Sequence, residues 1–188
     1  MTTEPFKLCI RCDLAEFRRN VIIGRGSIPA PILFIGEAPE KIDDLRGEAF
    51  VGKAGKLLDG MIIEACEMAG INEKEIPAHF FTYTVGCRPC NKLGGDSREP
   101  TEQEVLECLP RMNFIVDVVK PVVVIFVDKF SFKYFHNRFP EHFKIYHPSY
   151  LLRGGGKASP DYMLAVRKLA EVFTYYKEEV LYVDGVEN

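Results

Sequence analysis

The sequence lacks long apolar runs, a positive net charge and internal repeats, and each absence narrows what the chain can be. No stretch reaches the roughly 18 consecutive apolar residues that a membrane-spanning helix needs. The opening MTTEPFKLCIRC has neither the apolar core nor the small-residue cleavage site of a secretory signal. We therefore expect no membrane partner and a cytoplasmic location.

The charge balance limits the kind of partner. The 188 residues carry a formal net charge of −3, whereas broad affinity for nucleic acid requires lysine and arginine to neutralise many phosphates. Any contact with nucleic acid should therefore be local. The remaining composition, 47% apolar and 27% charged, is typical of an ordinary globular chain. We expect one domain over residues 1–188 and a monomer.

Hydrophobic periodicity predicts strands and helices in alternation. Short apolar or β-branched runs are typical of buried strands, and apolar residues at helical spacing predict amphipathic helices. The predicted strands cover residues 31–35, 79–85, 122–127 and 143–146, and the predicted helices cover residues 54–69, 101–119, 129–138 and 159–176. This alternation predicts an α/β fold: one three-layer αβα domain around a central, mostly parallel, four-stranded sheet.

Three predicted loops leave the carboxyl ends of strands, at residues 36–52, 86–100 and 147–157. Ligands of open α/β sheets bind at that edge of the sheet. The same loops hold most of the unusual polar residues of the chain. The sequence therefore predicts one site built from three loops.

Cysteine spacing indicates a metal centre, because a reducing compartment favours metal ligation over disulfides. Cys9 and Cys12 form a C-x2-C pair, which needs two partners. Pairing with Cys87 and Cys90 gives the pattern of a structural zinc site. Pairing with Cys87 and Cys108 instead suits an iron–sulfur cluster. Spacing alone leaves both pairings open.

Four segments in order carry a family resemblance. CIRCDLAEFRR (9–19) opens the chain, and GEAP (36–39) is followed by GEAFVGKAGKLL (47–58). CRP (87–89) comes next, with Cys108 downstream, and HPSYLLR (147–153) is the last segment. Together they resemble the two cysteine pairs and the two active-site motifs of the family 4, iron–sulfur-containing uracil-DNA glycosylases over nearly the whole chain.

The resemblance implies a [4Fe-4S] cluster, with Cys9, Cys12, Cys87 and Cys108 as its ligands. It also implies DNA as the partner, single- or double-stranded, with a pyrimidine flipped out of the strand. Enzymes that remove a base extrude it, read its edge and break the glycosidic bond through a cation-like sugar.

Each of these steps needs its own side chain. Glu37 lies between a predicted strand end and Ala38-Pro39, so it is the candidate to position a water or stabilise the positive sugar; Asp43 and Asp44 are secondary candidates. His147 can donate to a base carbonyl as negative charge develops there. Glu37 and His147 are therefore the candidate catalytic residues.

The remaining candidates bind the base or the DNA backbone. The resemblance implies that Phe50 stacks on the extruded pyrimidine. Arg153 and Lys157 flank three glycines, so that backbone and cations can approach a phosphate together. The base-binding candidates are Ala38, Phe50 and Tyr83, and the DNA-binding candidates are Ser149, Arg153 and Lys157.

One departure from the family pattern affects the pocket. The family usually has Thr-Asn ahead of its third cysteine, where the asparagine side chain reads the uracil edge, whereas this chain has Thr82-Tyr83. An asparagine amide offers a donor and an acceptor in one plane, and a tyrosine hydroxyl cannot reproduce that pair. We therefore expect an altered pocket.

Three functions remain open. The first is a uracil-DNA glycosylase with a divergent pocket, which the motif residues Glu37, Phe50 and His147 favour. The second is a superfamily member retooled to transfer an amine or amino acid onto an activated 5-hydroxymethyl pyrimidine in phage-type hypermodified DNA, which Tyr83 favours. The third is a non-catalytic, cluster-stabilised DNA-binding module, which the modest charge disfavours.

Overall fold

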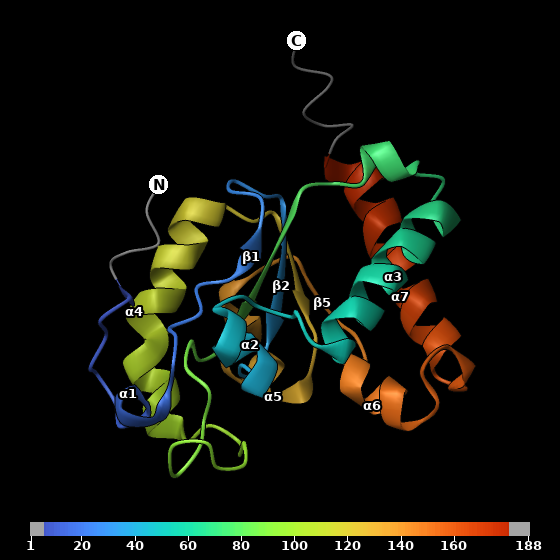
Figure 1. Ribbon diagram of the computed structural model, residues 1–188. Helices are drawn as coiled ribbons and strands as arrows, with labels where there is room; N and C mark the ends of the chain where they lie inside the picture. Colours follow the sequence, from blue (N-terminus) through green and yellow to red (C-terminus); the bar gives the residue numbers. More distant parts are fainter. Residues whose placement is uncertain (1–5, 181–188) are drawn as a thin grey trace. The chain divides into compact units, whose positions relative to one another are not determined.

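The computed structural model describes residues 6–180, and its contacts divide the chain into two compact units (Figure 1). The first unit comprises Met1–Gly52 with Ala78–Lys144, and the second comprises Lys53–Pro77 with Ile145–Asn188. The first unit contains the sheet, and the second contains three helices.

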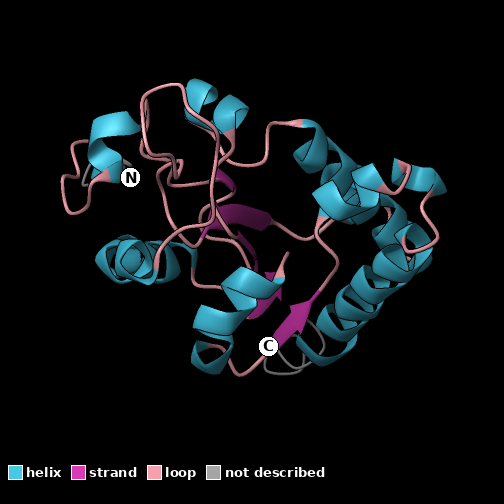
Figure 2. Cartoon of the chain, turned by 90° about the horizontal axis from the view of Figure 1, so that it is seen from below, coloured by secondary structure: helices cyan, strands magenta, loops and turns pink. Residues whose placement is uncertain are grey.

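A five-stranded sheet forms the centre of the first unit, and its strands lie side by side in Figure 2 (magenta). The order across the sheet is β1 (Arg25–Gly26), β3 (His79–Tyr83), β2 (Ile32–Gly36), β4 (Val123–Phe126) and β5 (His142–Lys144). Four strands run parallel, and β1 pairs antiparallel with β3. The predicted α/β class with a mostly parallel sheet is confirmed, but the predicted count of four strands is wrong by one.

The strand that the sequence did not predict is β1, because two residues are too few to show any alternation. Its glycine makes the pairing possible. Gly26 has a φ of +126°, and a Cβ at this position would lie 2.2 Å from the carbonyl oxygen of His79 on β3. Only glycine allows this conformation and this close approach.

One face of the sheet packs against α4 (Glu102–Val119) and α5 (Lys129–Phe135). All five residues of β2 and all four of β4 are buried, as unbroken apolar runs predict. The core on this face draws side chains from the sheet and from both helices, including Leu33, Ile35, Phe80, Val124, Phe126, Val105, Met112, Ile115, Val119 and Phe135. Helix α4 begins at the predicted capping box of Thr101 and Glu104.

Two of the predicted loops contain short helices. Helix α2 (Lys41–Arg46) lies within residues 36–52, where Glu40 and Asp43 form a capping box and Gly47 ends the helix at a φ of +71°. Helix α6 (Pro148–Arg153) lies within residues 147–157. Helices of six residues are too short for an apolar period to appear in the sequence.

The second unit is helical. It contains α3 (Lys53–Met68), α6 and α7 (Tyr162–Tyr175), and α3 contacts both of the others. The buried side chains of α7 recur every three to four residues, as an amphipathic helix requires. Short turns complete the described elements: α1 (Leu14–Phe17), 3-10 turns at Glu73–Glu75, His136–Arg138 and Gly156–Ala158, and a π-helical turn at Tyr176–Val180. Among residues 6–180, no helix has the length and apolar character to cross a bilayer.

Candidate functional site

The carboxyl end of β2 fixes the backbone of Glu37. Gly36 and Glu37 accept hydrogen bonds from the amides of Thr84 and Val85 at 2.7 and 3.3 Å. A Cβ at Gly36 would lie 2.6 Å from Cζ of Phe50 and 3.2 Å from Cδ1 of Tyr83. Position 36 therefore accepts no side chain, and Glu37 is held at the edge of the sheet where ligands of parallel sheets bind.

The environment of Glu37 disfavours its charged form. Burial of the half-buried side chain raises the pKa of Glu37 to about 7, with further contributions from the negative charges of Asp128, Glu99 and Glu40. A carboxyl group with a pKa near neutrality can take up and release a proton at working pH. A raised pKa is therefore one property that Glu37 shares with carboxyl groups that act as general bases.

Tyr83 and Phe50 form a closed aromatic pair beside Gly36. Their ring centroids are 4.6 Å apart with an interplanar angle of 19°, and both side chains are 4% exposed. The Tyr83 hydroxyl accepts a hydrogen bond from the Phe50 amide at 2.9 Å and donates one to Oδ2 of Asp43 at 3.0 Å. Phe50 has a φ of +54°, a left-handed conformation that a bulky residue adopts only when its surroundings hold it.

Asp43 organises this loop, a role that the sequence did not reveal. Its carboxylate accepts hydrogen bonds from the amides of Glu40 and Val51, as well as from Tyr83. Burial, followed by the charge of Asp43, raises the pKa of Tyr83 well above its usual value, so the phenol keeps its proton. The available signal was the capping-box spacing from Glu40 to Asp43.

Asp44 is buried and Ala38 is partly buried within the first unit. Asp44 is 4% exposed and accepts hydrogen bonds from the amides of Arg19 and Asn20. Neither Asp43 nor Asp44 is a solvated surface acid. Ala38 is partly buried and packs against the core of the first unit.

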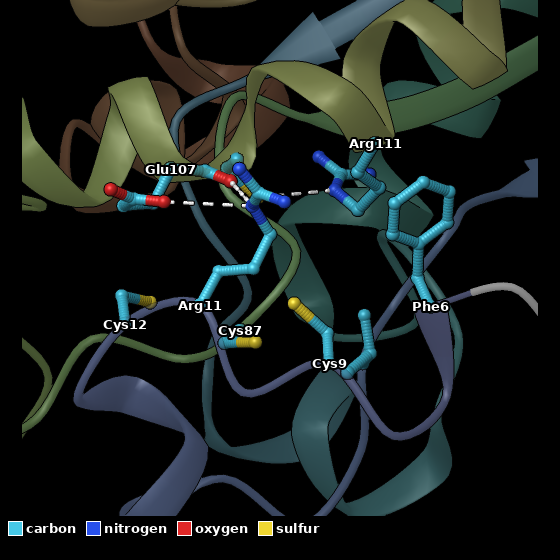
Figure 3. A pocket seen from close by; sticks show the side chains of 9 residues that line it. Phe6, Cys9, Arg11, Cys12, Cys87, Glu107 and Arg111 are labelled. Atoms are coloured by element: carbon cyan, nitrogen blue, oxygen red, sulfur yellow. Dashed lines mark hydrogen bonds and ion pairs between the residues drawn. The ribbon is translucent and has the colours of Figure 1, made fainter.

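Four cysteines line one hollow at the surface of the first unit (Figure 3). Cys9 and Cys12 come from the N-terminal segment, Cys87 from the loop after β3, and Cys108 from α4. In Figure 3 the sulfurs of Cys9 and Cys87 point into this space. Cys90 does not line the hollow, and its side chain is fully buried. The lining therefore contains the thiol set that the resemblance implied.

The chemistry of these thiols suits a cationic occupant. Burial raises the pKa of Cys87 to about 12 and also raises the pKa of Cys12, so both thiols need a nearby positive centre to ionise. The amide of Gly86 and Nε of Arg111 donate to Sγ of Cys108 at 3.3 and 3.4 Å. Such N–H···S bonds are typical of thiolates that hold iron–sulfur clusters.

No group of three or more His, Cys, Asp or Glu side chains within residues 6–180 is arranged to hold one metal ion. A cluster makes a different demand, because each of its irons takes its own thiolate. Four thiols distributed around a hollow match that demand.

The segment HPSYLLR (147–153) lies in the second unit and contains α6. His147 is the N-cap residue, and its Nδ1 accepts a hydrogen bond from the Ser149 amide at 3.0 Å, with Pro148 in the first turn. Because Nδ1 accepts, the proton of the neutral ring is on Nε2. His147 therefore has the tautomer that can donate from Nε2. Ser149 is half-buried on the same turn.

The two predicted phosphate-binding cations differ in their surroundings. Arg153 is exposed in the last turn of α6. Lys157, also exposed, forms an ion pair with Glu64 on α3. This pair could not be predicted from a local pattern, because 93 residues separate the partners. Arg153 is thus the better placed of the two for an anionic ligand.

The predicted site residues fall into two groups. Glu37, Ala38, Phe50 and Tyr83 belong to the first unit, together with the four cysteines. His147, Ser149, Arg153 and Lys157 belong to the second unit.

Comparison with known proteins gives relatives over most of the chain. A protein named type-4 uracil-DNA glycosylase from Sulfurisphaera tokodaii is 36% identical over 135 residues, covering 72% of this chain and 56% of the relative. Proteins of the same name from Saccharolobus solfataricus and Thermotoga maritima are 35% and 30% identical, covering 71% and 72% of this chain and 57% and 64% of the relatives. The chain thus spans a little over half the length of the curated relatives it matches.

The fold also has a solved counterpart. A crystal structure of Pedobacter heparinus SMUG2 superposes with a TM-score of 0.53 at 11% identity, covering 80% of this chain and 77% of that one. At this identity the likeness concerns the fold alone. The family model described as the uracil DNA glycosylase superfamily matches residues 23–170. The chain therefore belongs to the uracil-DNA glycosylase superfamily.

Proposed function

We propose that the chain is a DNA-base-processing hydrolase that cleaves the N-glycosidic bond of uracil or a related pyrimidine flipped out of single- or double-stranded DNA. The names of its relatives support this class of reaction. The observation that carries the proposal is Glu37, a half-buried carboxyl group at the carboxyl end of β2 whose pKa is raised to about 7.

In the proposed reaction, the bond between C1′ of the sugar and N1 of the base breaks, and its electron pair leaves with the base. Ionised Glu37 stabilises the cation-like sugar and accepts a proton from the water whose oxygen bonds to C1′. Nε2–H of His147 donates to the carbonyl oxygen on which the negative charge of the leaving base develops. The products are a free base and an abasic site.

The remaining candidates position the substrate. Phe50, with Ala38 and Tyr83, forms the base pocket in this proposal. Ser149 and Arg153 contact the phosphates beside the flipped nucleotide. Lys157 contributes less to DNA binding, because Glu64 already neutralises its ammonium group. A monomer, a single domain and a cytoplasmic location stay predictions.

We also propose that the hollow holds a [4Fe-4S] cluster through Cys9, Cys12, Cys87 and Cys108. The lining of the hollow and the hydrogen bonds to Cys108 support this ligand set. When bound, the cluster supplies metal–thiolate bonds that tie the N-terminal segment, the loop after β3 and α4 together. The four thiols hold the group, and Gly86 and Arg111 orient one of them.

Tyr83 favours a second candidate function. Its ring covers one face of Phe50, and its hydroxyl is already engaged with Asp43 and the Phe50 amide. A tyrosine hydroxyl engaged in this way does not supply the paired donor and acceptor that uracil requires, which favours another substrate, such as an activated 5-hydroxymethyl pyrimidine that receives an amine or amino acid. A non-catalytic DNA-binding module would not require a half-buried carboxyl group at the carboxyl end of β2, where ligands of parallel sheets bind.

Incubation with single- and double-stranded oligonucleotides tests these functions. The oligonucleotides contain uracil, 5-hydroxymethyluracil or thymine at one position, and abasic sites are detected by alkaline strand cleavage. The proposal expects abasic sites from at least one of these bases and none with the Glu37→Gln variant. DNA binding without abasic sites, from any of the three bases, would overturn it in favour of group transfer or simple binding.

A further inference from the structure

Arg111 is a buried guanidinium between the cysteine hollow and the end of β3. It is 2% exposed and lies three residues after Cys108 on α4, so the two side chains share one face of the helix. It is one of the residues that line the hollow, and Figure 3 shows it beside this space on α4. A charged residue among the apolar positions of a core-facing helix requires an explanation.

The guanidinium makes contacts on two sides. On one side, Nε donates to Sγ of Cys108 at 3.4 Å. On the other, Nη1 donates to the hydroxyl of Thr82 at 3.1 Å, and Nη2 donates to the carbonyl of Tyr83. Further carbonyl acceptors are those of Ile22, Ile23 and Thr84. One side chain thus connects a predicted cluster ligand to the peptide of the predicted base-reading residue.

The charge of Arg111 has no carboxylate partner by hydrogen bond among the described residues; its acceptors are carbonyls, a hydroxyl and a sulfur. Burying a charge without a counter-charge is costly. Metal-bound cysteines are thiolates, so an occupied hollow would bring negative charge directly to Arg111.

Gly86 makes this arrangement tight. Its amide donates to the same Cys108 sulfur at 3.3 Å. A Cβ at position 86 would lie 2.6 Å from Nε of Arg111 and 3.0 Å from the carbonyl oxygen of Ile22. The backbone at Gly86 therefore lies directly against the guanidinium, with no room for a side chain between them.

We propose that Arg111 is a positioning residue that couples occupation of the cysteine hollow to the conformation of β3 at Thr82 and Tyr83. Its guanidinium provides the counter-charge for the metal-bound thiolates. Its N–H groups hydrogen-bond both Cys108 and the strand that carries Tyr83, so that a change in the charge of the hollow affects the strand. This inference rests on the proposed cluster. It goes further, because it makes the base pocket sensitive to whether the hollow is filled.

The test uses hydrogen exchange and redox titration of the whole chain. Amide exchange of residues 82–86 is measured by mass spectrometry, before and after the metal is removed with ferricyanide and a chelator. In the wild type, removal of the metal should speed amide exchange of this segment by about tenfold or more, because Arg111, which holds the segment by hydrogen bonds, loses the negative charge of the thiolates. Arg111→Met should exchange fast in both states, with a cluster potential more negative than that of the wild type.

Two further variants separate charge from geometry. Arg111→Lys keeps the charge and should keep the potential near the wild-type value, but it should exchange as fast as Arg111→Met, because one ammonium cannot replace the fork. Arg18→Met is the matched control, because the guanidinium of Arg18 donates to the carbonyl of Cys9, another predicted ligand, and makes no hydrogen bond to β3 within residues 6–180. It should lower the potential while keeping the exchange response to metal removal.

A wild-type-like exchange response in Arg111→Lys overturns the coupling, even if Arg111→Met fails to fold. Metal content and base release are measured separately. Iron and sulfide without base release would overturn the proposed reaction but leave the coupling intact. If the wild type contains zinc, the same exchange comparison between loaded and chelated protein decides the coupling.

Discussion

The ring of Tyr83 lies nearly parallel to the ring of Phe50, with centroids 4.6 Å apart. The Tyr83 hydroxyl accepts a hydrogen bond from the Phe50 amide at 2.9 Å. One face of Phe50 is therefore covered by a residue of the same chain. A pyrimidine cannot stack on that face while Tyr83 stays in place. The identity of residue 83 should thus decide which base enters the pocket.

Tyr83→Asn is expected to raise uracil release. The substitution uncovers Phe50 and supplies the paired donor and acceptor that uracil requires, contacts whose absence costs several powers of ten in rate. We expect weak or no release by the wild type and a gain of about tenfold or more in the variant, measured by alkaline cleavage. Tyr83→Phe is the control, since it keeps the ring. Strong release by the wild type, unchanged in Tyr83→Phe, would contradict this view of the pocket.

Removal of Glu37 or His147 should abolish most of the activity. Glu37→Ala and His147→Ala are each expected to slow turnover by about a hundredfold or more, as when a transition-state contact is lost. Because the pKa of Glu37 is raised to about 7, the wild-type rate should rise with pH up to about 7 and then level off. Wild-type rates in both variants, with unaltered visible absorption, would rule out these roles.

Glu37→Gln should stabilise the fold at neutral pH. Burial raises the pKa of Glu37 from 4.5 to about 7, so the ionised form is less favourable in the folded state than in the unfolded state. Below pH 4.5 both states hold the proton, and stability falls as pH rises from 4.5 to about 7. Urea unfolding at several pH values should show an advantage of Glu37→Gln that grows across this window. A constant difference would contradict the assigned cause.

Cysteine variants distinguish the two ligand sets. Protein purified in air should be brown, with broad visible absorption that dithionite bleaches, because iron–sulfur thiolates give charge-transfer bands that zinc lacks. Cys108→Ser should abolish the colour, whereas Cys90→Ser should keep it, since Cys90 lies outside the hollow. The reverse pattern, or colourless protein with stoichiometric zinc, would restore the zinc pairing.

Arg153 should matter more than Lys157 for DNA affinity. Arg153→Ala is expected to weaken binding and to lower the slope of log affinity against log salt by about one, as for one lost phosphate contact. Lys157→Ala should change the slope less, because Glu64 already pairs with Lys157. Fluorescence anisotropy with labelled oligonucleotides measures both. Glu64→Gln should free Lys157 and strengthen binding; an equal loss in both alanine variants would refute the distinction.

Strands and helices with a clear local apolar pattern were predictable from the sequence. The strand expected at 31–35 is found at Ile32–Gly36, and the helix expected at 54–69 is found at Lys53–Met68. Both rest on local apolar patterns, which directly reflect burial. Helices α2 and α6 have six residues each, which is too short for such a pattern. Their sequence signals are the cap residues alone: Glu40 with Asp43, and His147 with Pro148.

Features that depend on distant partners were not predictable. The position of Tyr83 pointed to an altered pocket, but its bond to Asp43 joins residues 40 apart in the sequence. The contacts of Arg111 likewise reach back to Ile22 and Ile23, 89 and 88 residues away. Such contacts depend on the register of the strands, which no local pattern encodes.

The absence of space at Gly36 has a consequence for how this pocket can diverge. Any side chain there would overlap the rings of Phe50 and Tyr83, so the backbone that presents Glu37 cannot vary without disturbing the pair. Positions 50 and 83 can vary instead. Their side chains are in contact, so a smaller residue at one position leaves space for a larger residue at the other. Under the proposed function, a change of ring size at these two positions would alter which bases fit, while Glu37, the proposed catalytic carboxyl group, would keep its place on the sheet.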